Sequence, residues 1–431
     1  MNIVFFIIVF LAFTTAAWHQ LKWVPVLGAL SPMEKLSEAM VESAAGSVDL
    51  ALGLVGVMTL FLGLMKVAEA GGILTILSRL IRPLMVRLFP DVPAEHPAMG
   101  AMILNMSANA LGLGNAATPF GIRAMQELDK LNPRKGTATN SMALFLAINT
   151  SSITLLPTGV IALRAAAGSN DPAGILPTTL FATFGSTAAA IIAAKVYGRF
   201  FPAKNATECR EGVEVTGPSK ALDPAMISIP QEGYPIWVAI SVFCALITAV
   251  PLTVIYGRAI SPWIIPALMM GFLGFGVIKR VRIYEVFVDG AKEGFQVAIK
   301  IIPYLVAILV AVGMFRASGA MEAMVRGLGV WTVKFGLPAE ALPMALMRPL
   351  SGSGAYGIMA SIINDPAIGP DSYTGYLVST LQGSTETTFY VLAVYFGAVQ
   401  VRRIRHALAA ALTADVVGVI CAVLVCSYLF G

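Results

Sequence analysis

Two short polar segments interrupt long apolar stretches of this chain, and their side chains are of types that bind small ligands. The first segment has Asn149, Thr150, Ser151 and Ser152, and the second has Gln382, Ser384, Thr385, Glu386 and Thr387. Interrupted backbone at membrane depth is tolerated only where it is buried in protein or lines a watery cavity. Paired interruptions in the two halves of a transporter indicate a ligand site near the membrane midplane. We therefore predict that both segments contribute to one binding site.

Glu386 is a carboxylate about midway along an otherwise apolar segment. Ionisable residues at membrane depth are functional by default. If Glu386 is buried, it could take up a proton, or it could join Ser384 and Thr387 around a sodium ion. The alternative is a neutralising ion pair with Arg348, in which both residues would be structural, and the two roles can coexist.

Two more segments each combine a short apolar helix with a polar, glycine-rich end. In the first half the polar residues are Asn105, Ser107, Asn109 and Asn115, and in the second half they are Arg348, Ser351 and Ser353. These helices are too short to span a membrane, so we predict helical hairpins that re-enter the membrane with their tips packed against protein. Buried amides need hydrogen-bond partners, so the asparagines are predicted to line a cavity. Glycines there, such as Gly112 and Gly352, serve either close approach of a ligand or tight helix packing.

The composition predicts an all-α polytopic membrane protein. The chain has 431 residues, of which 57% are hydrophobic and 12% charged, and its mean hydropathy is +0.79. A soluble domain is typically about 25% charged. The apolar segments long enough to be candidate spans are Ile3–Trp18, Val48–Met65, Ser141–Leu163, Ile175–Tyr197, Ile236–Tyr256, Pro262–Ile278, Val297–Phe315, Tyr373–Val399 and Ala407–Phe430. The first lacks a basic leading region, so we expect a retained helix rather than a signal peptide.

Several function classes are disfavoured. The net charge of +5 comes from lysines and arginines in loops without interleaved aromatic residues, which favours a role in membrane orientation over binding of nucleic acid. The four cysteines form no CxxC motif and the three histidines are scattered, so we predict no metal site and no cofactor. No nucleophile and base are paired in the sequence, and we predict that the chain is not an enzyme.

The chain contains a duplicated unit. Ordered matches between its halves include Ala70-Gly71 with Ser318-Gly319 and Pro93-Ala94-Glu95 with Pro338-Ala339-Glu340, which indicate a repeat. We divide the chain into a first unit at 1–199, an exposed proline-rich linker at 200–235, and a region at 236–431 with two connecting helices and the second unit. Corresponding loops have opposite charge character: 123–135 is basic and 364–372 is not, whereas 402–405 is basic and 164–174 is nearly neutral. This exchange predicts inverted repeats, although a parallel duplication stays open.

Specific strings give the chain a family resemblance. The first half carries Gly112-Leu113-Gly114-Asn115-Ala116-Ala117-Thr118-Pro119, and the second carries Met347-Arg348-Pro349-Leu350-Ser351-Gly352-Ser353-Gly354 and Gln382-Gly383-Ser384-Thr385-Glu386-Thr387. With these strings the first half resembles spore maturation protein A and the second resembles spore maturation protein B. Both are classed with the nucleoside-recognition, or Gate, membrane proteins. The resemblance implies two inverted units, each with a re-entrant hairpin and a broken helix, similar to the core of concentrative nucleoside transporters.

The expected function is secondary transport of a small polar solute, nucleoside-like or related to the cell envelope, coupled to H⁺ or Na⁺. The alternative is a membrane scaffold or regulator of envelope or peptidoglycan processes that does not transport. We expect a multi-pass location in the bacterial inner membrane, with the solute and the lipid bilayer as partners and no nucleic acid. Internal pseudo-symmetry does not decide whether chains associate, so a homo-oligomer is left open.

Overall fold

The computed structural model describes residues 2–25, 28–112, 114–151, 153–201 and 233–431, so the predicted linker lies almost wholly outside the described residues. All regular elements in these ranges are helices, which confirms the predicted all-α class. The α-helices are α1 (Asn2–Leu21), α2 (Pro32–Ala70), α3 (Ile73–Leu88), α4 (Pro97–Ala110), α5 (Gly114–Lys130), α6 (Asn140–Thr150), α7 (Thr158–Ala166), α8 (Leu176–Phe200), α9 (Ile236–Ile278), α10 (Ile283–Ala317), α11 (Ala320–Thr332), α12 (Leu342–Met347), α13 (Gly352–Ile363), α14 (Tyr373–Ser384), α15 (Thr388–Gly397) and α16 (Ala407–Phe430).

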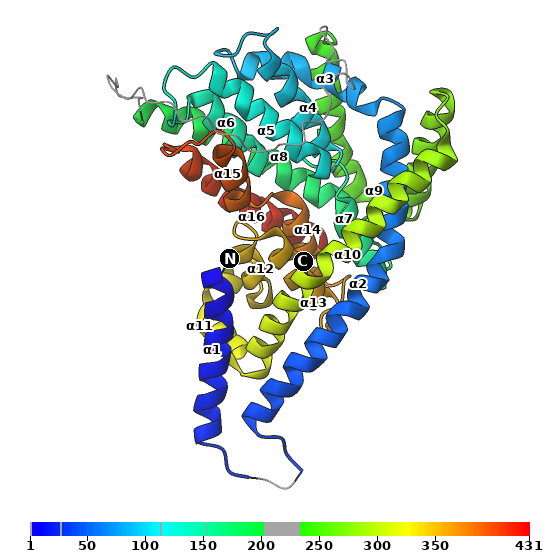
Figure 1. Cartoon of the computed structure of the whole chain (residues 1–431). Coiled ribbons are helices and arrows are strands. Elements are labelled where there is room, and N and C mark those ends of the chain that lie inside the picture. The colour runs from blue at the N-terminus through cyan, green and yellow to red at the C-terminus, as the bar shows by residue number, and fades with distance from the viewer. Residues whose placement is uncertain (1, 26–27, 113, 152, 202–232) are drawn as a thin grey trace.

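The long helices α2 and α10 pack along each other and flank the rest of the molecule (Figure 1). Their contact depends on small residues of α10. A Cβ atom added at Gly290 would lie 2.7 Å from the carbonyl oxygen of Leu62, and one added at Gly294 would lie 2.8 Å from that of Met58. Small residues at a helix crossing let two backbones approach closely. These glycines therefore bring the two helices together.

Two helices of the described ranges, α8 and α16, are each long and apolar enough to cross a membrane. A third candidate is the bent pair Val55–Ala70 and Ile73–Leu88, whose axes differ by 71°. Helices α8 and α16 also pack against each other. The apolar helices of the fold are thus those of a membrane protein.

Both predicted helix breaks are confirmed. Helix α6 ends at Thr150 and α7 begins at Thr158, while α14 ends at Ser384 and α15 begins at Thr388. The hairpins are also formed as helix pairs: α4 packs on α5, and α12 on α13. Each polar segment therefore spans the last residues of a helix and the first residues after it.

One helix prediction is wrong. We expected two helices at Ile236–Tyr256 and Pro262–Ile278 that return the chain to one side, but the structure has the single helix α9. A proline within a helix removes one hydrogen bond, yet its φ angle is close to that of a helix. Pro262 has no polar turn sequence after it, and the apolar chain continues as helix through it.

The loops of the two halves meet in pairs. Loops 131–139 and 398–406 are joined because the backbone N–H of Ala138 donates to the carbonyl oxygen of Arg403 at 3.0 Å, and that of Arg402 donates to Gly136 at 2.9 Å. Loops 167–175 and 364–372 are joined through Asp371, which accepts a hydrogen bond from the backbone N–H of Asn170 at 2.7 Å. The basic loops of the two halves thus lie together.

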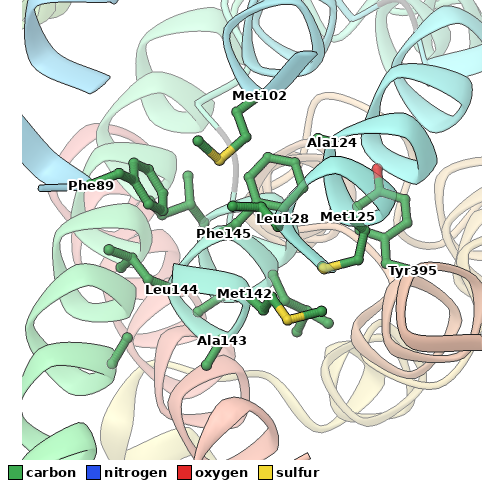
Figure 2. Close-up of a cluster of buried hydrophobic side chains, with 14 of the residues drawn as sticks. Phe89, Met102, Ala124, Met125, Leu128, Met142, Ala143, Leu144, Phe145 and Tyr395 are labelled. Atoms are coloured by element: carbon green, nitrogen blue, oxygen red, sulfur yellow. The ribbon is translucent and has the colours of Figure 1, made fainter. Parts of the chain in front are cut away.

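The largest apolar core lies around helices α4, α5 and α6 (Figure 2). Met102, Met125 and Phe145 come from the first half of the chain, and Tyr395 of the second half joins them. The rings of Phe145 and Tyr395 are stacked, with centroids 6.1 Å apart. The two halves therefore share one core.

His406 gives a pH-dependent prediction. Its side chain is buried just before α16, neither ring nitrogen has a hydrogen-bond partner among the described residues, and the ring stacks on Phe201. Burial, and secondly the charge of Arg405, lower the pKa of His406 below its ordinary value of 6.5. The unfolded chain therefore binds a proton more readily than the native one, and stability falls as the pH drops below about 6.5.

We expect His406→Phe to remove part of this loss at acidic pH because phenylalanine keeps the ring contact and does not titrate. The measurement is the melting temperature of both proteins between about pH 5.5 and pH 8. A mutant whose melting temperature falls as steeply with acid as that of the wild type would contradict the role given to His406.

Candidate functional site

The two helix breaks lie side by side. The backbone N–H of Glu386 in the second break donates to the carbonyl oxygen of Thr150, the last residue of α6, at 2.8 Å. Gly383 faces the first break: a Cβ atom added there would lie 3.3 Å from Cβ of Pro157. Segments more than 220 residues apart in the chain therefore meet, as the binding-site prediction requires.

Each hairpin tip contacts the broken helix of its own half. The N–H of Leu155 donates to the carbonyl oxygen of Ala110 at 2.8 Å, and the N–H of Phe389 donates to that of Pro349 at 3.1 Å. The two halves thus repeat one arrangement of tip and break.

Glycines at the tips serve packing of chain against chain. Gly112 has a φ angle of +73°, which favours glycine, and any Cβ atom there would collide with the carbonyl oxygen of Leu156. A Cβ atom added at Gly352 would lie 2.6 Å from Oγ1 of Thr387. Of the two roles considered for these glycines, the structure therefore gives tight packing to Gly112 and Gly352.

A buried polar cluster joins three predicted asparagines to a tyrosine of the other half. Asn149 Oδ1 accepts hydrogen bonds from Asn109 Nδ2 at 2.9 Å and from the Tyr395 hydroxyl at 3.3 Å, while Asn149 Nδ2 donates to Phe145 at 2.9 Å. The Tyr395 hydroxyl accepts from Asn105 Nδ2 at 3.2 Å. Sequence reasoning missed Tyr395, because nothing in an apolar stretch tells which buried hydroxyl will meet a distant amide.

Several predicted hydroxyls bond within their own segments. Ser107 donates to Ile103, Thr150 and Ser151 both donate to Ala147, Ser384 donates to Leu381, and Ser351 accepts from the N–H of Gly354 at the start of α13. Ser353 lies 3.5 Å from the Ser351 hydroxyl. Back-bonding of this kind satisfies a buried hydroxyl and ends helices. The side chain of Asn115 and the whole of Ser152 lie outside the described residues.

Arg348 is the buried cation of the site. Its side chain is 7% exposed, its Nη2 lies 3.9 Å from Glu386 Oε2, and its Nη1 donates to Thr387 Oγ1 at 3.4 Å. The Glu386 side chain is 50% exposed. The ion pair predicted as an alternative is therefore present but long, and the burial that proton uptake at Glu386 would need is not found.

Asp415 is a second carboxylate near the breaks, and the sequence analysis missed it. It is the ninth residue of α16 and is 5% exposed. Its Oδ2 accepts a hydrogen bond from Thr388 Oγ1, at the start of α15, at 2.6 Å. The signal was available, because one carboxylate in an apolar segment of spanning length is the same pattern that singled out Glu386.

The remaining site residues border this group. A Cβ atom added at Gly418 of α16 would lie 2.9 Å from the methyl group of Thr385, so α16 packs against the second break. The Oε1 atom of Gln382 is buried without a hydrogen-bond partner among the described residues. Amides, hydroxyls, one guanidinium and two carboxylates thus surround the two breaks. No three described His, Cys, Asp or Glu residues lie close enough together to hold a metal ion.

Comparisons with known proteins cover most of the segments that form the candidate site. Residues 51–201 and 298–402 match the Gate family, described as nucleoside recognition. The chain is 47% identical over 167 residues to spore maturation protein B of Bacillus subtilis (strain 168), an alignment that covers 39% of the chain and 93% of that protein. It is 48% identical over 160 residues to spore maturation protein A of the same organism, covering 37% of the chain and 82% of that protein.

A more distant relative is inner membrane protein YjiG of Escherichia coli (strain K12), which is 28% identical over 103 residues. That alignment covers 24% of the chain and 64% of the relative. No solved structure matches the chain. The relatives and the apolar helices together identify a membrane protein.

Proposed function

The chain belongs to the nucleoside-recognition (Gate) family and joins regions like spore maturation proteins A and B, and from this premise we propose that it is a secondary transporter of a small polar solute. The solute would be nucleoside-like or related to the cell envelope. The protein would be a multi-pass protein of the bacterial inner membrane, because its relative YjiG is named an inner membrane protein.

The hydrogen bond between Glu386 N–H and the Thr150 carbonyl oxygen carries this proposal, because it joins the broken helices of the two halves. Broken helices leave backbone groups and polar side chains available at membrane depth, and transporters bind substrates and ions at such places. The Asn109 and Asn149 amides, with Gln382 and Arg348, offer donors and acceptors to a polar solute. Glu386 adds a charge that a transported ion can interact with.

The pairing of loops supports inverted repeats. Loop 131–139 follows the hairpin of the first half and adjoins loop 398–406, which follows the broken helix of the second. Loop 364–372 follows the second hairpin and adjoins loop 167–175, which follows the first broken helix. Hairpin loops of one half therefore pair with broken-helix loops of the other, as an inverted plan similar to the core of concentrative nucleoside transporters requires. Rocking of one bundle against the other would then alternate access to the site.

The experiment measures the melting temperature of the purified chain with each member of a panel of nucleosides, amino acids, polyols and cell-wall precursors. Na⁺ concentration and pH are varied. A ligand at 100 times its Kd stabilises a protein by about 2.7 kcal/mol. We expect one solute class to raise the melting temperature, and Glu386→Gln to weaken this shift. Glu285 is an exposed carboxylate at the start of α10, so Glu285→Gln is the matched control and should keep the shift in melting temperature.

Uptake of the stabilising solute into proteoliposomes then separates transport from binding. Stabilisation with ion-dependent uptake supports the proposal. Stabilisation without uptake favours the alternative, a ligand-binding scaffold or regulator of envelope processes. A panel in which no solute stabilises the wild type, while Glu386→Gln only lowers its stability, would assign Glu386 to structure and contradict the proposal.

A further inference from the structure

Asp415 is a buried carboxylate, and only one of its two oxygen atoms has a hydrogen-bond partner among the described residues. Oδ2 accepts the hydrogen bond of Thr388 Oγ1, and Oδ1 has no partner among the described residues although it is buried. An ionised carboxylate accepts several hydrogen bonds, and an unmet buried charge costs much more than an unmet neutral group. The environment of Asp415 therefore supports a neutral, protonated form better than it supports a lasting charge.

The charges around Asp415 do not balance. Arg348 is close enough to Asp415 for an electrostatic interaction, but its Nη2 also pairs with Glu386 at 3.9 Å, and its Nε is buried without a partner. One cation thus serves two carboxylates. With both carboxylates ionised the group carries one net negative charge, and a single proton makes it neutral. Buried ion groups are stable only when charge and hydrogen bonds are matched.

We propose that Asp415, hydrogen-bonded to Thr388 and within electrostatic range of Arg348, is the proton-binding site of this chain and makes H⁺ the coupling ion, an inference that rests on the proposed transport function. The step is the addition of one proton to a carboxylate oxygen of Asp415 from water on one side of the membrane, and its return to water on the other. No other bond changes.

The same surroundings disfavour sodium. A hard cation such as Na⁺ needs several oxygen ligands, whereas one hydroxyl, that of Thr388, is bonded to Asp415. The guanidinium of Arg348 also repels a metal cation at this place. A proton needs no ligand shell, and it removes the charge that burial penalises.

Few other ionisable groups face Asp415. Helix α6 has none, and the lysine and arginine of α8, Lys195 and Arg199, lie towards the end where Gly198 meets His406. From α8 the hydroxyl of Ser186 donates to the carbonyl oxygen of Ala414, and the ionisable hydroxyl of Tyr197 lies 3.1 Å from Thr413 Oγ1. The ionisable side chains of α15 are Tyr390 and Tyr395, those of α14 are Tyr373 and Tyr376, and Cys421 and Cys426 lie further along α16.

Arg348 links proton binding to the helix break. When Asp415 is ionised it attracts the guanidinium, and when Asp415 is protonated the guanidinium is free to pair with Glu386 and Thr387. Arg348 stands at the end of α12, beside the hairpin tip whose Pro349 accepts from the N–H of Phe389. A change of partner at Arg348 therefore acts on the contact between tip and break.

The test is infrared difference spectroscopy of the full chain in lipid between about pH 5 and pH 8.5. We expect a carbonyl band of a protonated carboxylic acid that disappears as pH rises. Asp415→Asn should abolish the band, Glu386→Gln should keep it, and the exposed control Asp289→Asn should leave it unchanged. Asparagine can keep the bond to Thr388, so a melting temperature near that of the wild type shows that the fold survives.

Arg348→Gln supplies a readout that a purely structural Asp415 would not give. Removal of the cation makes the ionised carboxylate less favourable, so the band should persist to higher pH, with the midpoint raised by about one unit or more. A band that survives in Asp415→Asn, or a midpoint unmoved by Arg348→Gln, overturns the inference. These outcomes are separate from those of the solute panel: a titrating Asp415 without any stabilising solute keeps the proton site and rejects transport.

Discussion

Replacing Arg164 with methionine is expected to lower the free energy of unfolding by about 3 kcal/mol, because it removes a fully buried guanidinium together with its hydrogen bonds to Asp371, Ser169 and the carbonyl oxygen of Pro370. Arg164 is fully buried at the end of α7. Its Nη2 lies 3.0 Å from Asp371 Oδ1 and donates to Ser169 Oγ, its Nη1 donates to the carbonyl oxygen of Pro370 at 2.6 Å, and its guanidinium lies over the ring of Tyr376. One side chain thus holds loops of both halves together.

Arg316 offers a matched control. It pairs with Asp365 at 2.9 Å, in the same loop as Asp371, but its side chain is 34% exposed whereas that of Arg164 is 0% exposed. Exposed ion pairs contribute between about 0 and 1 kcal/mol. Arg316→Met should therefore change the free energy of unfolding by less than about 1 kcal/mol.

The measurement is denaturant unfolding of the three proteins in one detergent, followed by tryptophan fluorescence. Similar losses in Arg164→Met and Arg316→Met would mean that burial does not set the strength of the Arg164 contacts. A loss in Arg164→Met of under about 1 kcal/mol would place the junction of loops 167–175 and 364–372 among ordinary surface contacts.

Replacing Asn149 with leucine is the second large expected effect, a loss of about 2 to 3 kcal/mol in the free energy of unfolding. Leucine is similar in shape to asparagine, but it removes the acceptor of the Asn109 amide and of the Tyr395 hydroxyl, and each unmet buried polar group costs about 1 to 3 kcal/mol. Asn149 accepts from both groups, so the loss should be shared with the other half of the chain.

A double-mutant cycle with Tyr395→Phe measures that sharing. Phenylalanine keeps the stacked ring on Phe145 and removes the hydroxyl, so the double mutant should be less destabilised than the sum of the single mutants by at least about 0.5 kcal/mol. Asn364→Leu is the control, because the Asn364 amide donates to Ala360 four residues earlier as Asn149 does to Phe145. Additive losses in the cycle would show that the bond between Asn149 and Tyr395 contributes nothing.

Much of the architecture follows from local chemistry that the sequence displays directly. Runs of apolar residues predict membrane helices, and segments such as Asn149–Ser152 predict breaks because serine, threonine and asparagine bond to nearby backbone and end helices. Both breaks are found where the polar residues lie. The error at α9 has the same local origin, because a new helix was predicted to begin at Pro262 although a helix can continue through a proline.

The partners of the buried polar groups were beyond the reach of sequence. Tyr395 and Asp415 are separated from Asn149 by about 250 residues, and which of the buried hydroxyls and carboxylates face the breaks depends on how the helices of the two halves cross. Proton uptake at Glu386 was considered for a buried side chain, yet this side chain is half exposed. Apolar neighbours in sequence predict a buried segment, whereas the exposure of Glu386 depends on its position in the break between α14 and α15.

The family, the helical class, the positions of the two breaks and the recurrence of hairpin and broken helix could therefore all be predicted from the sequence. These depend on residue types within a few turns of each other, where propensity and hydrophobicity act. The folded structure was needed to show that the breaks touch through Glu386 and Thr150, that Gly112 and Gly352 accommodate backbone and side chain of the chain itself, and that Arg348 interacts with two carboxylates. These depend on contacts between distant segments, which form when the shared apolar core of the two halves packs.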